Sequence, residues 1–140
     1  MQQKILTANG QKAYQRTDTE DRSLPYRNWL RTIKGNGMFL DVDMVKWQKI
    51  NGQYTPKAIT DITRCDKEKI TQHYLDSITY RIFQRDAQGG VLRRLGALLQ
   101  IPVYLVLFQK ELLWLKVYDF QEDCWKDFTP QTWELHLASL

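Results

Sequence analysis

The chain has 140 residues, enough for one hydrophobic core, and no apolar run in it reaches the length of a membrane span. Hydrophobic residues make up 43% and charged residues 26%, which excludes a disordered chain, and the net charge of +4 weakly favours a polyanionic partner. The first residues lack the apolar block of a secretory signal. The sequence therefore predicts a cytoplasmic protein with no membrane partner, whose Cys65 and Cys124 are reduced.

The N-terminal part predicts an arm followed by one domain. Residues 1–22 are polar and their few apolar residues follow no sustained period, so we expect an extended or partly ordered arm. A helix is predicted to begin at Ser23, with Pro25 in its first turn, and to end at the Gly-Asn-Gly stretch 35–37. Residues 23–140 then form the domain.

The next segment predicts a hairpin. Residues 38–47, MFLDVDMVKW, are interpreted as a strand with Asp41 and Asp43 on one face. Asn51-Gly52 is a strong turn signal, and residues 57–64, KAITDITR, form the returning strand.

A long helix and a second hairpin complete the predicted fold. Apolar residues recur every four positions from Ile70 to Ile82, which predicts an amphipathic helix from Asp66 onward, broken at Gly89-Gly90. The later elements are a central strand at 101–108, its partner at 112–120 and a short terminal helix capped at Thr129-Pro130. This order predicts an α/β fold with a mixed central sheet flanked by helices.

Three acidic residues on the first hairpin are candidates for chemistry: Asp41, Asp43 and Asp61. Carboxylates gathered at one end of a sheet suit Mg²⁺, which activates water and supports phosphodiester hydrolysis. The alternative is that these acids face water or pair with Lys46, Lys57 and Arg64, and spacing alone favours this alternative.

The segments FLDVDMV, AITDITR and LGALLQIPVYLVLF together resemble the PD-(D/E)XK nuclease superfamily, as a small divergent member, over residues 26–118. The resemblance implies a restriction-endonuclease-like core that hydrolyses duplex DNA with Mg²⁺ or Mn²⁺. It also implies a homodimer that places two sites on opposite strands.

The resemblance assigns roles to particular positions. Asp43 looks like the first metal-binding aspartate, with Asp41 as a substitute or helper, and Asp61 occupies the second acidic position. Two residues later this chain has Thr63 where the family has a lysine that orients the attacking water. Candidates for a cation that replaces this lysine are Lys57, Arg64, Lys67, Lys69 and Arg81, with Gln84 a further candidate from the helix.

Basic residues form two groups in the sequence, one near residues 22–34 and one near 81–94. Such groups can bind a phosphate backbone, although charge alone favours the interpretation as ordinary solvated helix faces. The residues predicted to bind nucleic acid are Arg27, Arg31, Lys34, Arg64, Arg81 and Arg85. Tyr26, Trp29, Trp47 and Tyr54 lie among these cations; stacking on bases is one interpretation, and packing is the favoured one.

The sequence thus favours a metal-dependent endonuclease. The alternative is a catalytically inactive module of the same fold that binds nucleic acid or a protein partner, and Thr63 is its best support. A third interpretation is an accessory protein that uses its aromatic side chains as a protein interface.

Overall fold

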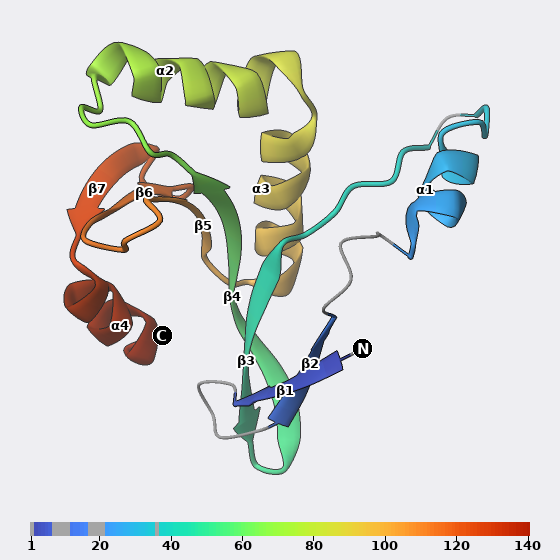
Figure 1. Cartoon of the computed structure of the whole chain (residues 1–140), viewed down its shortest axis with the longest axis horizontal. Coiled ribbons are helices and arrows are strands. Elements are labelled where there is room, and N and C mark those ends of the chain that lie inside the picture. Colours follow the sequence, from blue (N-terminus) through green and yellow to red (C-terminus); the bar gives the residue numbers. More distant parts are fainter. Residues whose placement is uncertain (1, 7–11, 17–21, 36) are drawn as a thin grey trace. The chain divides into compact units, whose positions relative to one another are not determined.

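The structure, a computed structural model, describes residues 2–6, 12–16, 22–35 and 37–140, which divide into two compact units, 1–39 and 40–140 (Figure 1). The first unit holds two antiparallel strands, β1 (Gln2–Leu6) and β2 (Lys12–Arg16). The other residues of the predicted arm, 1, 7–11 and 17–21, lie outside the described residues. The predicted helix is confirmed as α1 (Leu24–Leu30), with Ser23 at its N-cap position.

The second unit is built on a five-stranded sheet in the order β3–β4–β5–β6–β7. Its strands are β3 (Met44–Ile50), β4 (Gln53–Arg64), β5 (Val103–Phe108), β6 (Leu115–Asp119) and β7 (Cys124–Phe128). Strands β4 and β5 are parallel and the other neighbours are antiparallel. The predicted α/β class with a mixed sheet is confirmed, and β5 is the central strand as expected.

The β3–β4 hairpin turns at Asn51-Gly52, where both residues have positive φ, 52° and 80°. This pair of angles is typical of the tight turns that join twisted strands. The prediction that the first strand begins at Met38 is wrong, because β3 begins at Met44. Ahead of β3, the Asp43 carboxylate accepts a hydrogen bond from the Ile62 backbone N–H at 2.9 Å, where a backbone carbonyl would otherwise continue the ladder.

Three consecutive helices connect β4 to β5: α2 (Gln72–Tyr80), the π-helix η1 (Arg81–Arg85) and α3 (Gln88–Leu99). The predicted helix start at Asp66 is wrong, since Thr71 is the N-cap and its hydroxyl accepts a hydrogen bond from the Tyr74 N–H. The predicted break into two helices is confirmed, but it lies at residues 86–87, just ahead of Gly89-Gly90. Gly89 instead lies buried in the first turn of α3.

Helices cover both faces of the sheet (Figure 1). On one face, α2 and α3 pack over Ile59, Leu105 and Leu107. On the other face, α4 (Pro130–Ala138) buries Trp133 against strands β5 and β6. Strand β7 was not predicted, because its residues are mostly half-buried and do not alternate between apolar and polar.

Two further observations bear on the sequence analysis. Within the described part of the chain, no helix is long and apolar enough to cross a membrane. No disulfide joins Cys65, which is buried, to Cys124, which is half-buried, and their reduced state stays a prediction.

Candidate carboxylate site

The side chains of Asp43 and Asp61 come together at the upper end of the β3–β4 hairpin. Met44 pairs with Thr60 and Val45 with Ile59. Continuing this register by one residue beyond the Met44–Thr60 pair sets Asp43 opposite Asp61. Val45 packs against the core beneath α2 and α3, and side chains two residues apart on a strand share a face. Both carboxylates therefore lie on the face of the sheet that carries these helices.

The two carboxylates differ sharply in their exposure to solvent. Asp43 is exposed, whereas the side chain of Asp61 is buried, with only 4% of its surface exposed. Burial of an ionised carboxylate is costly unless its oxygens are paired. The pair therefore consists of one carboxylate that solvent reaches and one that the protein encloses.

The Asp61 carboxylate is only partly satisfied. Its Oδ2 accepts a hydrogen bond from the Gln88 side-chain amide at the start of α3. Its Oδ1 is buried and, among the described residues, has no hydrogen-bond partner. Because Asp43 is itself an acceptor, Oδ1 needs either a proton shared with Asp43 or a cation between the two groups.

Burial, followed by the hydrogen bond with Asp43 and the charge of Asp43, raises the pKa of Asp61 from 3.8 to about 7. The positive charge of Arg81 opposes this rise. A carboxyl group of this kind is partly protonated at neutral pH, so a divalent cation and a proton compete for the same position.

Arg81 is the cation whose charge acts on Asp61. It lies in η1, directly after α2. Its charge also acts on the Tyr74 hydroxyl, in α2. Short π-helical turns are frequent at functional sites because they re-aim side chains. Sequence reasoning named Arg81 as one of several candidates and missed Gln88, since a glutamine at a helix start carries no distinctive signal.

The structure does not bring the other predicted catalytic residues into this pair. Asp41 is exposed, and the described residues contain no group of three or more His, Cys, Asp or Glu side chains that could hold a metal ion. Thr63 is half-buried on the same face as Asp61, two residues further along β4. Lys57 is the extra residue of a bulge, four positions or about 13 Å before Asp61 along the strand.

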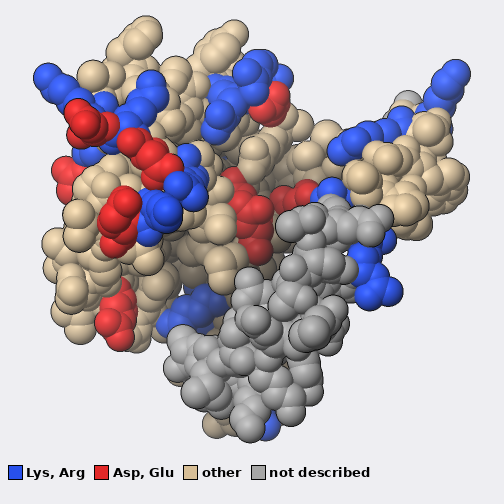
Figure 2. Space-filling model, viewed as in Figure 1, with Lys and Arg blue, Asp and Glu red and all other residues tan. Residues whose placement is uncertain are grey.

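The residues predicted to bind nucleic acid are spread over both units. Arg64 pairs with Asp66 at 2.7 Å, and Arg85 pairs with its neighbour Asp86 at 3.3 Å; all four side chains are largely exposed. Arg27, Arg31 and Lys34 belong to the unit 1–39, where Arg31 donates a hydrogen bond to Asn28. Figure 2 shows Lys and Arg side chains interspersed with Asp and Glu over the upper part of the unit 40–140.

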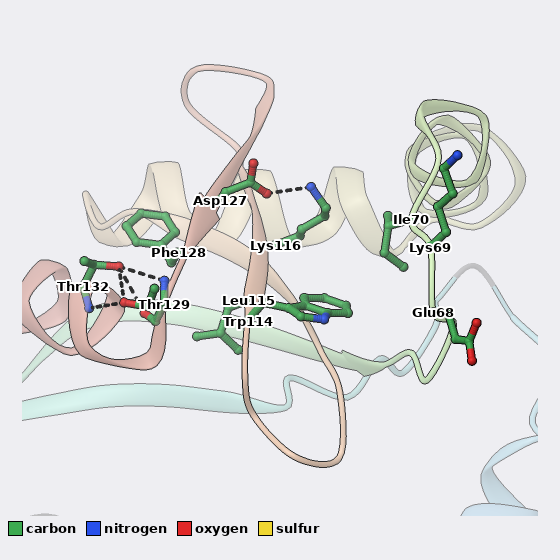
Figure 3. A pocket seen from close by; sticks show the side chains of 10 residues that line it. All are labelled: Glu68, Lys69, Ile70, Trp114, Leu115, Lys116, Asp127, Phe128, Thr129 and Thr132. Carbon is green, nitrogen blue, oxygen red and sulfur yellow. Dashed lines mark hydrogen bonds and ion pairs between the residues drawn. The ribbon is translucent and has the colours of Figure 1, made fainter.

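A separate cavity of about 640 Å³ lies on the same unit (Figure 3). Trp114, Ile70 and Phe128 form its apolar walls, and the ion pair of Lys116 with Asp127, 2.6 Å long, borders it. The cavity is not lined by any of the four residues of the carboxylate site, Asp43, Asp61, Arg81 and Gln88. It is therefore distinct from the site of the paired carboxylates.

Comparison with protein-family models, curated proteins and solved structures gives no match. The chemistry of the site must be argued from its own residues. A buried and an exposed carboxylate, a nearby guanidinium and a fixed amide can hold a hard cation and an anionic substrate side by side.

Proposed function

We propose that this chain is a metal-dependent endonuclease that hydrolyses DNA phosphodiester bonds at the Asp43–Asp61 pair. The observation that carries the proposal is the buried Asp61 Oδ1, which has no donor in the described part of the chain and lies beside a second carboxylate. A structural carboxylate would be expected to satisfy its oxygens with donors, as buried polar groups generally do. A buried carboxylate oxygen to which none of the described residues donates, next to a second carboxylate, is instead suited to a cation.

The donor set fits Mg²⁺ or Mn²⁺. Hard divalent cations of this size are held by one or two carboxylates together with waters and substrate phosphate, so Asp43 and Asp61 suffice. When bound, the metal would supply an activated water and would offset negative charge on the phosphate. Gln88 holds the Asp61 carboxylate in place through its Oδ2, which leaves Oδ1 for the cation.

The remaining residues act on the substrate. Asp43 is exposed and so meets a phosphodiester that approaches from solvent. The Arg81 guanidinium supplies a fixed positive charge that can bind a phosphate oxygen with two parallel hydrogen bonds. This charge compensates in part for Thr63, whose neutral hydroxyl stands at the family's lysine position. Duplex DNA as substrate and a homodimeric assembly remain predictions from the resemblance.

Cleavage of plasmid DNA tests the proposal. Purified protein is incubated with supercoiled plasmid and Mg²⁺, Mn²⁺ or a chelator, beside Asp43→Asn and Asp61→Asn. Asp127→Asn is the matched control, because its carboxylate is 80% exposed and pairs with Lys116 at a distance from the site. We expect cutting that requires metal and that both site variants lose while the control retains it. Equal cutting by all four proteins would contradict the proposal.

A second candidate function is a nuclease-like module that binds nucleic acid or a protein without cleaving it. Thr63 is the observation that favours this candidate, because a neutral side chain cannot orient the attacking water as an ammonium does. The variant Thr63→Lys separates the two candidates. Cleavage by the wild type supports the enzyme, whereas an inactive wild type that gains metal-dependent cutting on Thr63→Lys supports the inactive module.

A further inference from the structure

The β3–β4 hairpin extends well beyond the sheet to which it belongs. Strand β5 pairs only with residues 59–64 of β4, so residues 53–58 are hydrogen-bonded to β3 alone. Figure 1 shows this part of the hairpin projecting past the other strands of the unit 40–140. Residues 47–50 of β3 and 53–54 of β4 are exposed, whereas residues 55–57 are half-buried and Ala58 is buried. A two-stranded ribbon is marginally stable on its own, so the exposed end of this hairpin calls for a functional reason.

The projecting part carries exposed aromatic side chains on the face of the paired carboxylates. Along β3, Trp47 follows Asp43 and Val45 at alternate positions, which places the three on one face. Lys49 is the next β3 residue on this face, and Tyr54 is its cross-strand partner. Trp47 is 51% exposed and Tyr54 is 67% exposed, so neither side chain belongs to the core and both rings offer surface to a partner.

The charged side chains of residues 44–58 of the hairpin are all basic. Residues 44–58 contain Lys46, Lys49 and Lys57 and no acidic residue. The Lys49 ammonium lies over the Tyr54 ring, 5.5 Å from its centroid, so a cation and an aromatic face are presented together. Lys46 makes a contact within the protein, since its ammonium donates a hydrogen bond to the Leu137 carbonyl on α4.

We propose that this hairpin binds an unpaired stretch of DNA next to the scissile phosphate, with Trp47 and Tyr54 stacking on bases and Lys49 binding the backbone. The inference rests on the proposed function and adds to it the form of the substrate. Exposed rings interleaved with cations are the arrangement by which proteins bind single strands, since bases within a duplex are not free to stack on them.

The dimensions of the hairpin fit this role. Lys49 lies six residues from Asp43, which is about 20 Å along an extended strand. Compact single-strand-binding sites cover about four or more nucleotides, a comparable length. The preferred substrate is therefore DNA with an unpaired segment beside the cleavage position, such as a single strand or a tailed duplex.

Binding of labelled oligonucleotides without metal tests the inference independently of cleavage. The probes are a 20-nucleotide single strand, a blunt duplex of the same length and a duplex with a single-stranded tail, measured by fluorescence anisotropy. We expect the wild type to bind the first and third probes more tightly than the blunt duplex. Trp47→Ala and Tyr54→Ala should each weaken binding of the unpaired probes about fivefold or more and leave duplex binding unchanged.

Controls separate this result from misfolding and from charge effects. Leu135→Ala removes an equally exposed apolar side chain, 71% exposed on α4, and should bind like the wild type. Lys49→Ala should lower the salt dependence of single-strand binding by about one counterion, with an unchanged melting temperature.

Three outcomes would overturn the inference: no binding of any probe at low salt, equal affinity for blunt and unpaired probes, or unchanged binding by both aromatic variants. Binding that depends on the hairpin, together with a wild type that does not cleave, would support the inference while removing the proposed hydrolysis. The two proposals therefore fail in distinguishable ways.

Discussion

At the scale of single residues, the proposed site depends on a carboxyl group that the fold keeps out of water. The pKa of Asp61 rises to about 7 because burial and the neighbouring Asp43 disfavour its ionised form. At low pH the shared proton satisfies the buried oxygen, and at higher pH a cation is needed in its place. Acid–base behaviour and stability are therefore linked at this one side chain, and the proposed metal binding would be linked to both.

Stability should fall with rising pH because of Asp61. Asp61 keeps its proton up to about pH 7 in the folded protein, whereas in the unfolded chain it releases the proton near pH 3.8. The contribution to stability is therefore full below pH 3.8 and is lost as the pH rises through about 7. Urea unfolding should show this loss in the wild type, and Asp61→Asn should be more stable than the wild type at pH 8 by about 2 kcal/mol. Equal pH dependence in both proteins would contradict the raised pKa.

Arg81 should matter for the rate of cleavage more than for the fold. Arg81→Ala removes the positive charge beside the carboxylates and should lower kcat about 100-fold, as does the loss of one stabilising donor in other enzymes. Arg81→Lys should recover part of this loss, because it keeps the charge but not the two-pronged geometry. Arg94→Ala, at an exposed position on α3, is the control and should leave kcat unchanged. Full activity of Arg81→Ala would remove Arg81 from the site.

At the scale of secondary-structure elements, the site depends on how closely α3 approaches η1. A Cβ atom at Gly89 would lie 2.5 Å from Cδ1 of Phe83 and 2.8 Å from the Ile82 carbonyl oxygen. The absence of a side chain at Gly89 thus allows the start of α3 to lie against η1. This contact holds Gln88 and Arg81, one from each helix, beside the same carboxylate.

Alanine substitutions at the two adjacent glycines should have opposite effects. Gly89→Ala should destabilise the protein by about 1–3 kcal/mol, since the added carbon meets backbone and a packed ring. Gly90→Ala should stabilise it by about 0.5–1 kcal/mol, because nothing lies within 4 Å of the added carbon and alanine favours a helix. Urea denaturation of both variants checks this; the same sign for both would mean that the close approach is not what requires Gly89.

The sequence predicts some elements well and others badly, for identifiable reasons. The turn at Asn51-Gly52 and the cap at Thr129 were predictable because both rest on local chemistry. The position of the break before α3 was not, because Gly89, which signalled it, serves a tertiary contact in the first turn of α3. That Asp43 and Asp61 come together was predictable from the hairpin, whereas the burial of Asp61 and its bond to Gln88 arise only in the fold.

At the scale of the whole molecule, each face of the sheet serves a different purpose. The face beneath α2 and α3 carries the carboxylates, and the face beneath α4 carries a separate apolar core that contains Tyr104, Val117 and Trp133. Trp133 and Tyr104 meet edge to face, with ring centroids 5.2 Å apart. Stability and chemistry can therefore be altered separately.

Truncation at Trp133 should test this separation. Trp133→Ala removes a side chain that is 8% exposed and should cost about 3–5 kcal/mol of stability. Below its melting temperature the variant should still bind Mn²⁺ with the affinity of the wild type, because the site lies on the opposite face. Calorimetric titration with Mn²⁺ measures this, and a large loss of affinity in the folded variant would show that the two faces are coupled.

The pH dependence of DNA cleavage at two Mg²⁺ concentrations tests the central claim most directly. The account predicts that the rate rises as the pH passes through about 7, because the proton on Asp61 must leave before the cation can bind. It also predicts that more Mg²⁺ moves the midpoint to lower pH and that Asp61→Asn abolishes cleavage. Absence of cleavage at every pH, or a profile that neither Mg²⁺ nor Asp61→Asn changes, would contradict the claim that Asp43 and Asp61 form a metal-dependent hydrolytic site.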